Sequence, residues 1–106
     1  MKSALLSIAV AVVSTMAAHA TTDEQAAFAA GQVRSAYDRV RFICLANGFP
    51  MQTYEQLHPG EQKLHGQLKA KYPDFYAAGA AKGVRSANAI MSDADDRARW
   101  CAVYGR

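Results

Sequence analysis

The chain has only two cysteines, Cys44 and Cys101, and they lie far apart in the sequence. A bond between them would enclose most of residues 21–106 in one loop. They do not form a CxxC pair, the spacing of thioredoxin-like redox sites, so that chemistry is not indicated. Whether they pair depends first on the compartment in which the protein folds, because disulfides persist in oxidising surroundings.

The first twenty residues have the three-part layout of a secretory signal peptide. Lys2 supplies the positive charge, residues 4–13 form an apolar run broken only by Ser7, and residues 18–20 (AHA) form a small-x-small cleavage site. The polar residues behind the run leave too few apolar positions for a membrane span of about 20 residues. We therefore expect a signal peptide at 1–20, cleavage before Thr21, and a periplasmic or secreted protein without a stable membrane span.

Residues 21–106 would remain after cleavage, which is enough for a single small domain. The formal net charge of +3 would fall to +2 with the loss of Lys2. This balance is only mildly basic and lacks the concentrated basic face of nucleic-acid-binding domains, so we expect no nucleic-acid partner. A domain of this size is marginally stable without a crosslink.

The first mature segment, up to Asn47, has the pattern of a long helix. Thr22 and Gln25 have the spacing of a capping box, and Gly48 and Pro50 end the helix. Gly31 weakens its first half by up to about 1 kcal/mol. Helical steps of three and four define one face, formed by Val33, Tyr37, Val40, Cys44 and Asn47.

Two shorter segments are expected next. Thr53 and Gln56 repeat the capping-box spacing and predict a short turn of helix over TYEQL. Pro59 suits the first position of a further helix. Pro73 disfavours helical geometry at Tyr72, so that helix should end or kink there.

Two more helical segments complete the chain. Asp74 is expected to cap a helix through Met91, and Ser92 to cap a final helix that contains Cys101. Gly79 and Gly83 leave a smooth strip against which another helix could pack closely. The expected apolar face of the first of these helices is Tyr76, Ala80, Val84, Ala87 and Met91. The sequence therefore predicts an all-α domain, a small bundle of three to four helices.

The two cysteines are predicted to form a structural disulfide. Cys44 lies near the end of the first predicted helix and Cys101 near the end of the last, both on apolar faces. On the chain-entropy account such a bridge stabilises the fold by on the order of 4 kcal/mol. A free thiol or an intermolecular bridge is the alternative.

No pattern in the sequence indicates catalysis or a cofactor. There is no G-x-S-x-G and no H-E-x-x-H motif. Cys101 lies late in a predicted helix, where the helix dipole disfavours a thiolate. We expect no catalytic residue, no enzymatic activity and no bound cofactor.

A metal site is not expected either. Glu61 and His65 have helical spacing, but His58 precedes Pro59 and no further ligand completes the set. The acidic stretch SDADDR does not match a calcium loop, because Ala98 stands where the glycine is needed.

Exposed aromatic residues are the usual anchors of protein-binding surfaces. Two apolar stretches qualify, the loop NGFPMQTY and the aromatic stretch around YPDFY. The candidate protein-binding surface consists of Phe49, Met51, Tyr54, Tyr72, Phe75 and Tyr76. These residues could instead close the core, in which case the lysines among them are solvated.

The leading expectation is an exported accessory or inhibitor-type protein that acts by binding another protein in its compartment. A periplasmic stress or chaperone-like protein is the second hypothesis. In overall layout the chain is similar to small disulfide-linked acid-stress chaperones, although the similarity is one of architecture and not of motif. A small metal-binding protein that uses His58, Glu61 and His65 is the third.

Overall fold

The computed structural model describes residues 21–104, so the predicted signal peptide at 1–20 lies outside the described residues. Within that range all regular secondary structure is helical and there is no strand, which confirms the all-α prediction. The described residues form five helices: α2 (Thr22–Ala46), α3 (Tyr54–Leu57), α4 (Gln62–Lys71), α5 (Pro73–Ile90) and α6 (Ala94–Tyr104).

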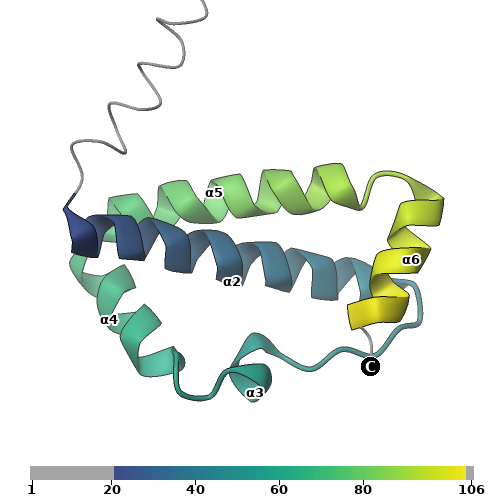
Figure 1. The fold of residues 1–106 in the computed structure, drawn as a ribbon, viewed down its shortest axis with the longest axis horizontal. Coiled ribbons are helices and arrows are strands. Elements are labelled where there is room, and N and C mark those ends of the chain that lie inside the picture. Colours follow the sequence, from purple (N-terminus) through teal and green to yellow (C-terminus); the bar gives the residue numbers. More distant parts are fainter. Residues whose placement is uncertain (1–20, 105–106) are drawn as a thin grey trace, which may run out of the picture.

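The helices are arranged nearly in a single layer. Helices α2 and α5 lie side by side, the segment with α3 and α4 returns along the other flank of α2, and α6 crosses the far end (Figure 1). The Cα atoms span 47 × 38 × 16 Å. The molecule is thus thinnest across this layer. Few side chains can therefore be buried from all directions.

Three glycines let α2 and α5 approach until their backbones touch. Gly31 belongs to α2, and Gly79 and Gly83 belong to α5. A Cβ at Gly79 would lie 2.8 Å from the carbonyl carbon of Phe28, and a Cβ at Gly83 would lie 3.0 Å from the amide nitrogen of Ala36. A Cβ at Gly31 would overlap the backbone of α5. No other residue type fits these positions, because carbon atoms prefer separations of about 3.5–4.0 Å.

The hydrogen that stands in place of each missing Cβ points at a carbonyl oxygen of the other helix. Gly79 faces the oxygen of Phe28, and Gly83 faces the oxygen of Gln32. Such Cα–H···O contacts contribute about 0.5–1 kcal/mol each, which offsets part of the low helix propensity of glycine. Because the residue numbers rise together in the two pairs, α2 and α5 run parallel.

The buried face of α5 differs from the expected one. Ala87 and Met91 are buried as predicted. The rest of the buried face consists of Gly79 and Gly83 in place of the predicted Tyr76, Ala80 and Val84. Val84 remains 36% exposed. The strip of smallest residues faces α2 because larger side chains would hold the two helices apart.

Exchange of Gly79 for alanine tests this contact. Gly79→Ala should lower the free energy of unfolding by about 1–3 kcal/mol, because its methyl group overlaps the backbone at Phe28. The matched control is Gly66→Ala in α4, where nothing lies within 4 Å of the new Cβ. That variant should gain about 0.5–1 kcal/mol from helix propensity. Urea denaturation measures both, and equal effects of the two changes would contradict the close contact.

The first helix begins one residue earlier than predicted. Thr21, and not Thr22, is the N-cap: its hydroxyl accepts a hydrogen bond from the Glu24 amide at 3.1 Å, and the Glu24 carboxylate accepts one from the Thr21 amide at 2.9 Å. A carboxylate near the positive end of a helix stabilises the helix more than the amide of Gln25 would. The capping box therefore forms between Thr21 and Glu24. At the other end, Gly48 has a positive φ of 84°.

Three other starting positions differ from the prediction, whereas the capping box of Thr53 and Gln56 is confirmed. Pro59 does not begin α4, because it lies in a turn in which the Glu61 amide donates to the carbonyl of His58 at 3.1 Å. Pro73 itself is the first residue of α5, so Asp74 lies in the first turn and does not cap it.

The cap of α6 is Asp93 and not Ser92. One carboxylate oxygen of Asp93 accepts hydrogen bonds from the amides of Asp95 and Asp96, at 2.9 and 3.0 Å. The hydroxyl of Ser92 instead donates to the carbonyl of Ala89 at the end of α5. Each residue therefore serves a different helix end.

The predicted disulfide between Cys44 and Cys101 is present and joins the last turns of α2 and α6. Both half-cystines are fully buried. They form a core cluster with Met51 and Met91. The side chains that pack around this cluster are Tyr37, Val40, Ile43 and Phe49.

Removal of the bridge should be costly. Changing Cys44 and Cys101 together to alanine should lower the free energy of unfolding by about 4 kcal/mol, because the bridge closes a long loop. The two residues are separated by 57 positions. Thermal and urea denaturation measure the change, and a loss below about 1 kcal/mol would show that the rest of the core holds α6 in place.

Candidate functional site

An apolar groove opens where α2, α3, α5 and α6 come together, with a volume of about 310 Å³. Helices α2 and α5 form two of its walls, α6 closes one end, and the α3 segment borders it from the returning flank. The lining residues are Val33, Ala36, Tyr37, Val40, Tyr54, His58, Ser86, Ala87, Ile90, Met91, Trp100 and Tyr104.

The floor and the rim of the groove differ in exposure. Ala87, Met91 and Tyr54 are buried and form the floor. The rim consists of large apolar side chains that are each about two-fifths to one-half exposed: Val33, Ile90, Trp100 and Tyr104. A side chain inserted into the groove would remove these rim residues from water.

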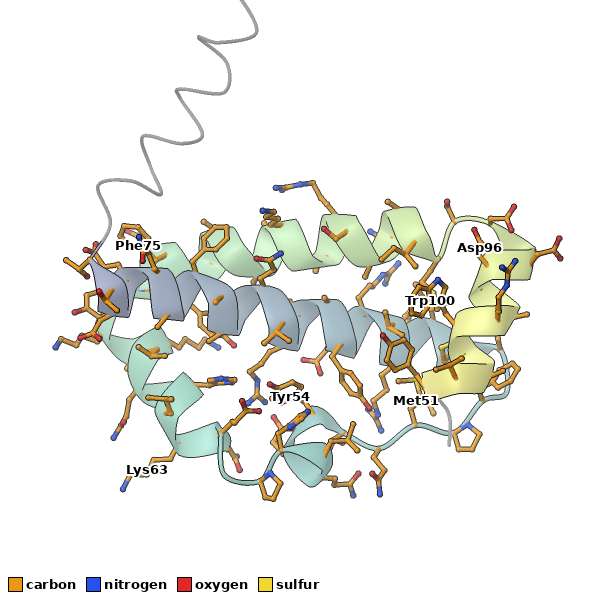
Figure 2. The ribbon with its side chains drawn as sticks, in the orientation of Figure 1. Met51, Tyr54, Lys63, Phe75, Asp96 and Trp100 are labelled. Atoms are coloured by element: carbon orange, nitrogen blue, oxygen red, sulfur yellow. A yellow bond between two sulfur atoms is a disulfide. The ribbon has the colours of Figure 1, made fainter. Side chains whose placement is uncertain are left out.

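Helix α6 holds the aromatic end of the groove. Trp100 and Tyr104 stack with ring centroids 5.5 Å apart and an angle of 13° between their planes. Figure 2 shows Trp100 on the side of α6 that faces α2 and α5. The guanidinium of Arg97 donates to the carbonyl of Met91 at 3.0 Å, and the Cys101 disulfide fixes the following turn. The position of the aromatic pair is therefore fixed by the disulfide and by the Arg97 hydrogen bond to the end of α5.

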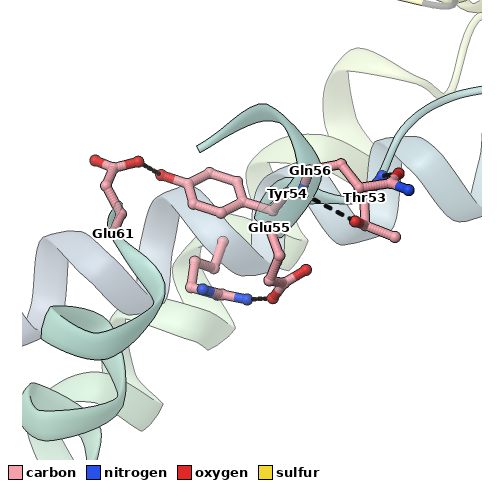
Figure 3. A network of polar contacts seen from close by, with 6 residues as sticks. Thr53, Tyr54, Glu55, Gln56 and Glu61 are labelled. Carbon is pink, nitrogen blue, oxygen red and sulfur yellow. Dashed lines mark hydrogen bonds and ion pairs between the residues drawn. The ribbon is translucent and has the colours of Figure 1, made fainter. Parts of the chain in front are cut away.

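Tyr54 attaches the returning segment to α2. Its ring makes an edge contact with Tyr37 at 5.8 Å, and its hydroxyl donates to the Glu61 carboxylate at 2.8 Å. Arg34 lies 4.9 Å above the ring and forms an ion pair with Glu55 (Figure 3). One buried tyrosine thus connects α2, α3 and the start of α4.

These contacts alter the acidity of the phenol. Burial, followed by the hydrogen bond to Glu61 and the negative charge of Glu61, raises the pKa of Tyr54 from 10.0 to about 12. The positive charge of Arg34 acts in the opposite direction. The folded protein therefore keeps the Tyr54 proton at a pH at which the unfolded chain has released it.

This difference makes stability depend on alkaline pH. Because the folded pKa of Tyr54 is about 12 and the unfolded value is 10.0, its contribution is complete below pH 10 and is lost as the pH rises towards 12. Urea denaturation from about pH 9 to pH 12 should show a falling free energy of unfolding, and Tyr54→Phe should show a smaller fall. Equal slopes for both proteins would contradict the assignment.

The residues of the predicted protein-binding surface do not lie together in one exposed patch. Met51 and Tyr54 are 7% and 4% exposed and belong to the interior. Phe49 packs against the disulfide cluster. Tyr72, Phe75 and Tyr76 are half-buried at the opposite end, around the start of α5. Tyr54 alone of the six lines the groove.

The three residues weighed as metal ligands do not converge on one point. His58 lies 3.4 Å from the Glu61 carboxylate through Nδ1, and the His65 ring contacts the ring of Tyr54 at a centroid distance of 5.8 Å. Within residues 21–104, no three His, Cys, Asp or Glu side chains are placed to hold a metal ion.

Sequence reasoning missed the groove as a unit. The shared face of Trp100 and Tyr104 was visible in the sequence, and so was the helical spacing of Val33 with Tyr37. That these four residues line one groove with Ile90 was not visible, because it depends on the parallel packing of α2 and α5.

Comparison with family models, with curated proteins and with solved structures found no match to this chain. In the part of the chain that the structure describes, no helix has both the length and the apolar character needed to cross a membrane.

Proposed function

We propose that the protein is a small exported binding protein that contacts another protein through the apolar groove between α2, α5 and α6. The observation that carries this proposal is the rim of large side chains that stay exposed around the groove. Val33 and Ile90 are 47% and 46% exposed, and Trp100 and Tyr104 are 39% and 47% exposed. Exposed apolar patches of this kind mark interaction sites, because binding of a partner removes the apolar surface from water.

The groove suits the apolar side chains of a partner protein better than a free small molecule. Its volume of about 310 Å³ is at the low end of the range of small-molecule sites, which is about 300–1,000 Å³. Tryptophan and tyrosine are enriched at the centres of protein interfaces, where they supply large contact areas at low entropic cost. His58 is the only ionisable side chain of the lining besides tyrosine hydroxyls, so an apolar anchor is the expected guest.

The predicted signal peptide and the disulfide support the same proposal. The bridge between Cys44 and Cys101 is typical of proteins that fold in oxidising compartments, where the partner would also be found. The proposal assigns no catalytic step to the protein. It differs from chaperone-like binding of unfolded chains in requiring a discrete partner with a fixed anchor.

Charged substitutions at the rim test the proposal. The mature protein would be immobilised and exposed to extract from its own compartment, and any retained protein would be identified and its affinity measured. Val33→Lys and Ile90→Lys should each weaken that affinity at least about tenfold, the loss typical of an interface hot spot. Both residues are about half exposed, so the folded state should persist, as circular dichroism would show.

Phe42→Lys is the matched control. Phe42 is a large apolar residue of α2 that is 63% exposed and does not line the groove, and the change adds the same charge. Trp100 provides a second measurement, since it is the single tryptophan and its emission should shift when the groove is filled. Equal loss of binding in Phe42→Lys and Val33→Lys, or retention of many unfolded proteins without selectivity, would contradict the proposal.

A further inference from the structure

A second pocket lies between α4, α2 and the first turn of α5, and it has the opposite chemistry to the groove. Its volume is about 190 Å³, and no residue lines both sites. The lining residues are Arg34, Gln62, His65, Gly66, Lys69 and Tyr76. It therefore requires an explanation separate from protein binding.

One face of α4 supplies most of this lining. Gln62, His65, Gly66 and Lys69 follow the helical spacing of positions that share a face. Across from them lies Arg34 of α2, whose side chain is only 14% exposed. Two permanent cations border the pocket and no carboxylate lines it.

The cations retain donors for a ligand. Arg34 forms an ion pair with Glu55 through Nη2 alone, and within residues 21–104 its other N–H groups make no hydrogen bond. A guanidinium has five such donors. The ammonium of Lys69 lies 5.4 Å from the ring centroid of Tyr76, so the aromatic ring holds it at the pocket without using its hydrogen-bonding capacity.

His65 is the independent sign that the pocket receives a polar group. It is 8% exposed, and its Nδ1 is the one buried side-chain nitrogen or oxygen among residues 21–104 that has no hydrogen-bond partner. Buried polar atoms almost always have a partner, which can be a bound ion or ligand. Because His65 lines a cationic pocket, its unpartnered Nδ1 is available for a hydrogen bond to a ligand bound there.

Gly66 leaves the space that such a ligand needs. Nothing lies within 4 Å of the position of a Cβ at this residue, although it belongs to the face of α4 that borders the pocket. A larger side chain at this position would enter open space and would not strain the helix.

We propose that this pocket binds a phosphate dianion, either free or carried by a small organic molecule. Lys69 supplies a positive charge that no carboxylate balances, and Arg34 donates through the N–H groups that its ion pair with Glu55 leaves free. Gln62 and His65 donate further hydrogen bonds to the phosphate oxygens, and Gly66 provides room for the ligand. Arginine and lysine are the side chains that bind phosphate most effectively, the first through its planar donors and the second as a point charge.

Titration of the mature, oxidised protein with inorganic phosphate at constant ionic strength tests the site. Amide chemical shifts measured by NMR should saturate, with the largest changes at residues 62–69, and the dissociation constant should lie in the millimolar range. Lys69→Gln should weaken binding about tenfold, because one charge-assisted contact is lost. Glycerol phosphate serves as the second ligand: tighter binding than that of inorganic phosphate identifies the organic source, and weaker binding identifies the free ion.

Two variants separate this pocket from general attraction to a basic protein. Lys63→Gln removes the same charge from an exposed position of the same helix outside the pocket, and should leave the affinity unchanged. Gly66→Leu keeps every charge but fills the pocket, and should abolish saturable binding. Equal weakening by Lys63→Gln and Lys69→Gln, unchanged binding in Gly66→Leu, or no saturable response in the unmodified protein would each overturn the proposal.

Discussion

Gly79 of α5 faces the carbonyl of Phe28 in α2 with only a hydrogen atom between the two backbones, and this contact determines where the other elements can lie. The two helices run parallel, so a short turn cannot join them. Residues 47–72 must return along the whole of α2 before α5 begins, which produces the segment that carries α3 and α4 (Figure 1). The dipoles of two parallel helices place charges of like sign side by side and repel each other. Close packing of α2 against α5 has to outweigh this repulsion.

The resulting layer is too thin to bury all of its large side chains. Methionines and half-cystines fill the core at one end, whereas glycine and alanine occupy the contact between α2 and α5. Larger residues such as Ile90 and Trp100 are displaced to the edges of this contact, where they surround the groove. The exposed rim thus follows from the same small-residue packing that stabilises the fold, and the proposed binding role uses what that packing leaves uncovered.

Helical periodicity could be predicted from the sequence, whereas most helix starts and the features that depend on distant segments could not. The helical periods, the Thr53 cap and the Cys44–Cys101 bridge follow from short-range chemistry and from the size of the domain. Met51 and Tyr54 stand in an apolar loop that could equally be a surface or a core, and only their contacts with α2 decide that they are buried. The cationic pocket was not predicted, because it joins Arg34 to a face of α4 that is distant in sequence.

Native-state hydrogen exchange measures most directly whether the α2–α5 contact supports the rest of the fold. If the contact supports the fold, amides around Gly31 in α2 and around Gly83 in α5 should exchange only through global unfolding, with one shared free energy. Amides of α4 should exchange through local opening at a lower free energy, since that segment packs against a pair that is already formed. Two results would contradict a supporting role for the α2–α5 contact: protection of α4 equal to that of α2 and α5, or different free energies of exchange for α2 and α5.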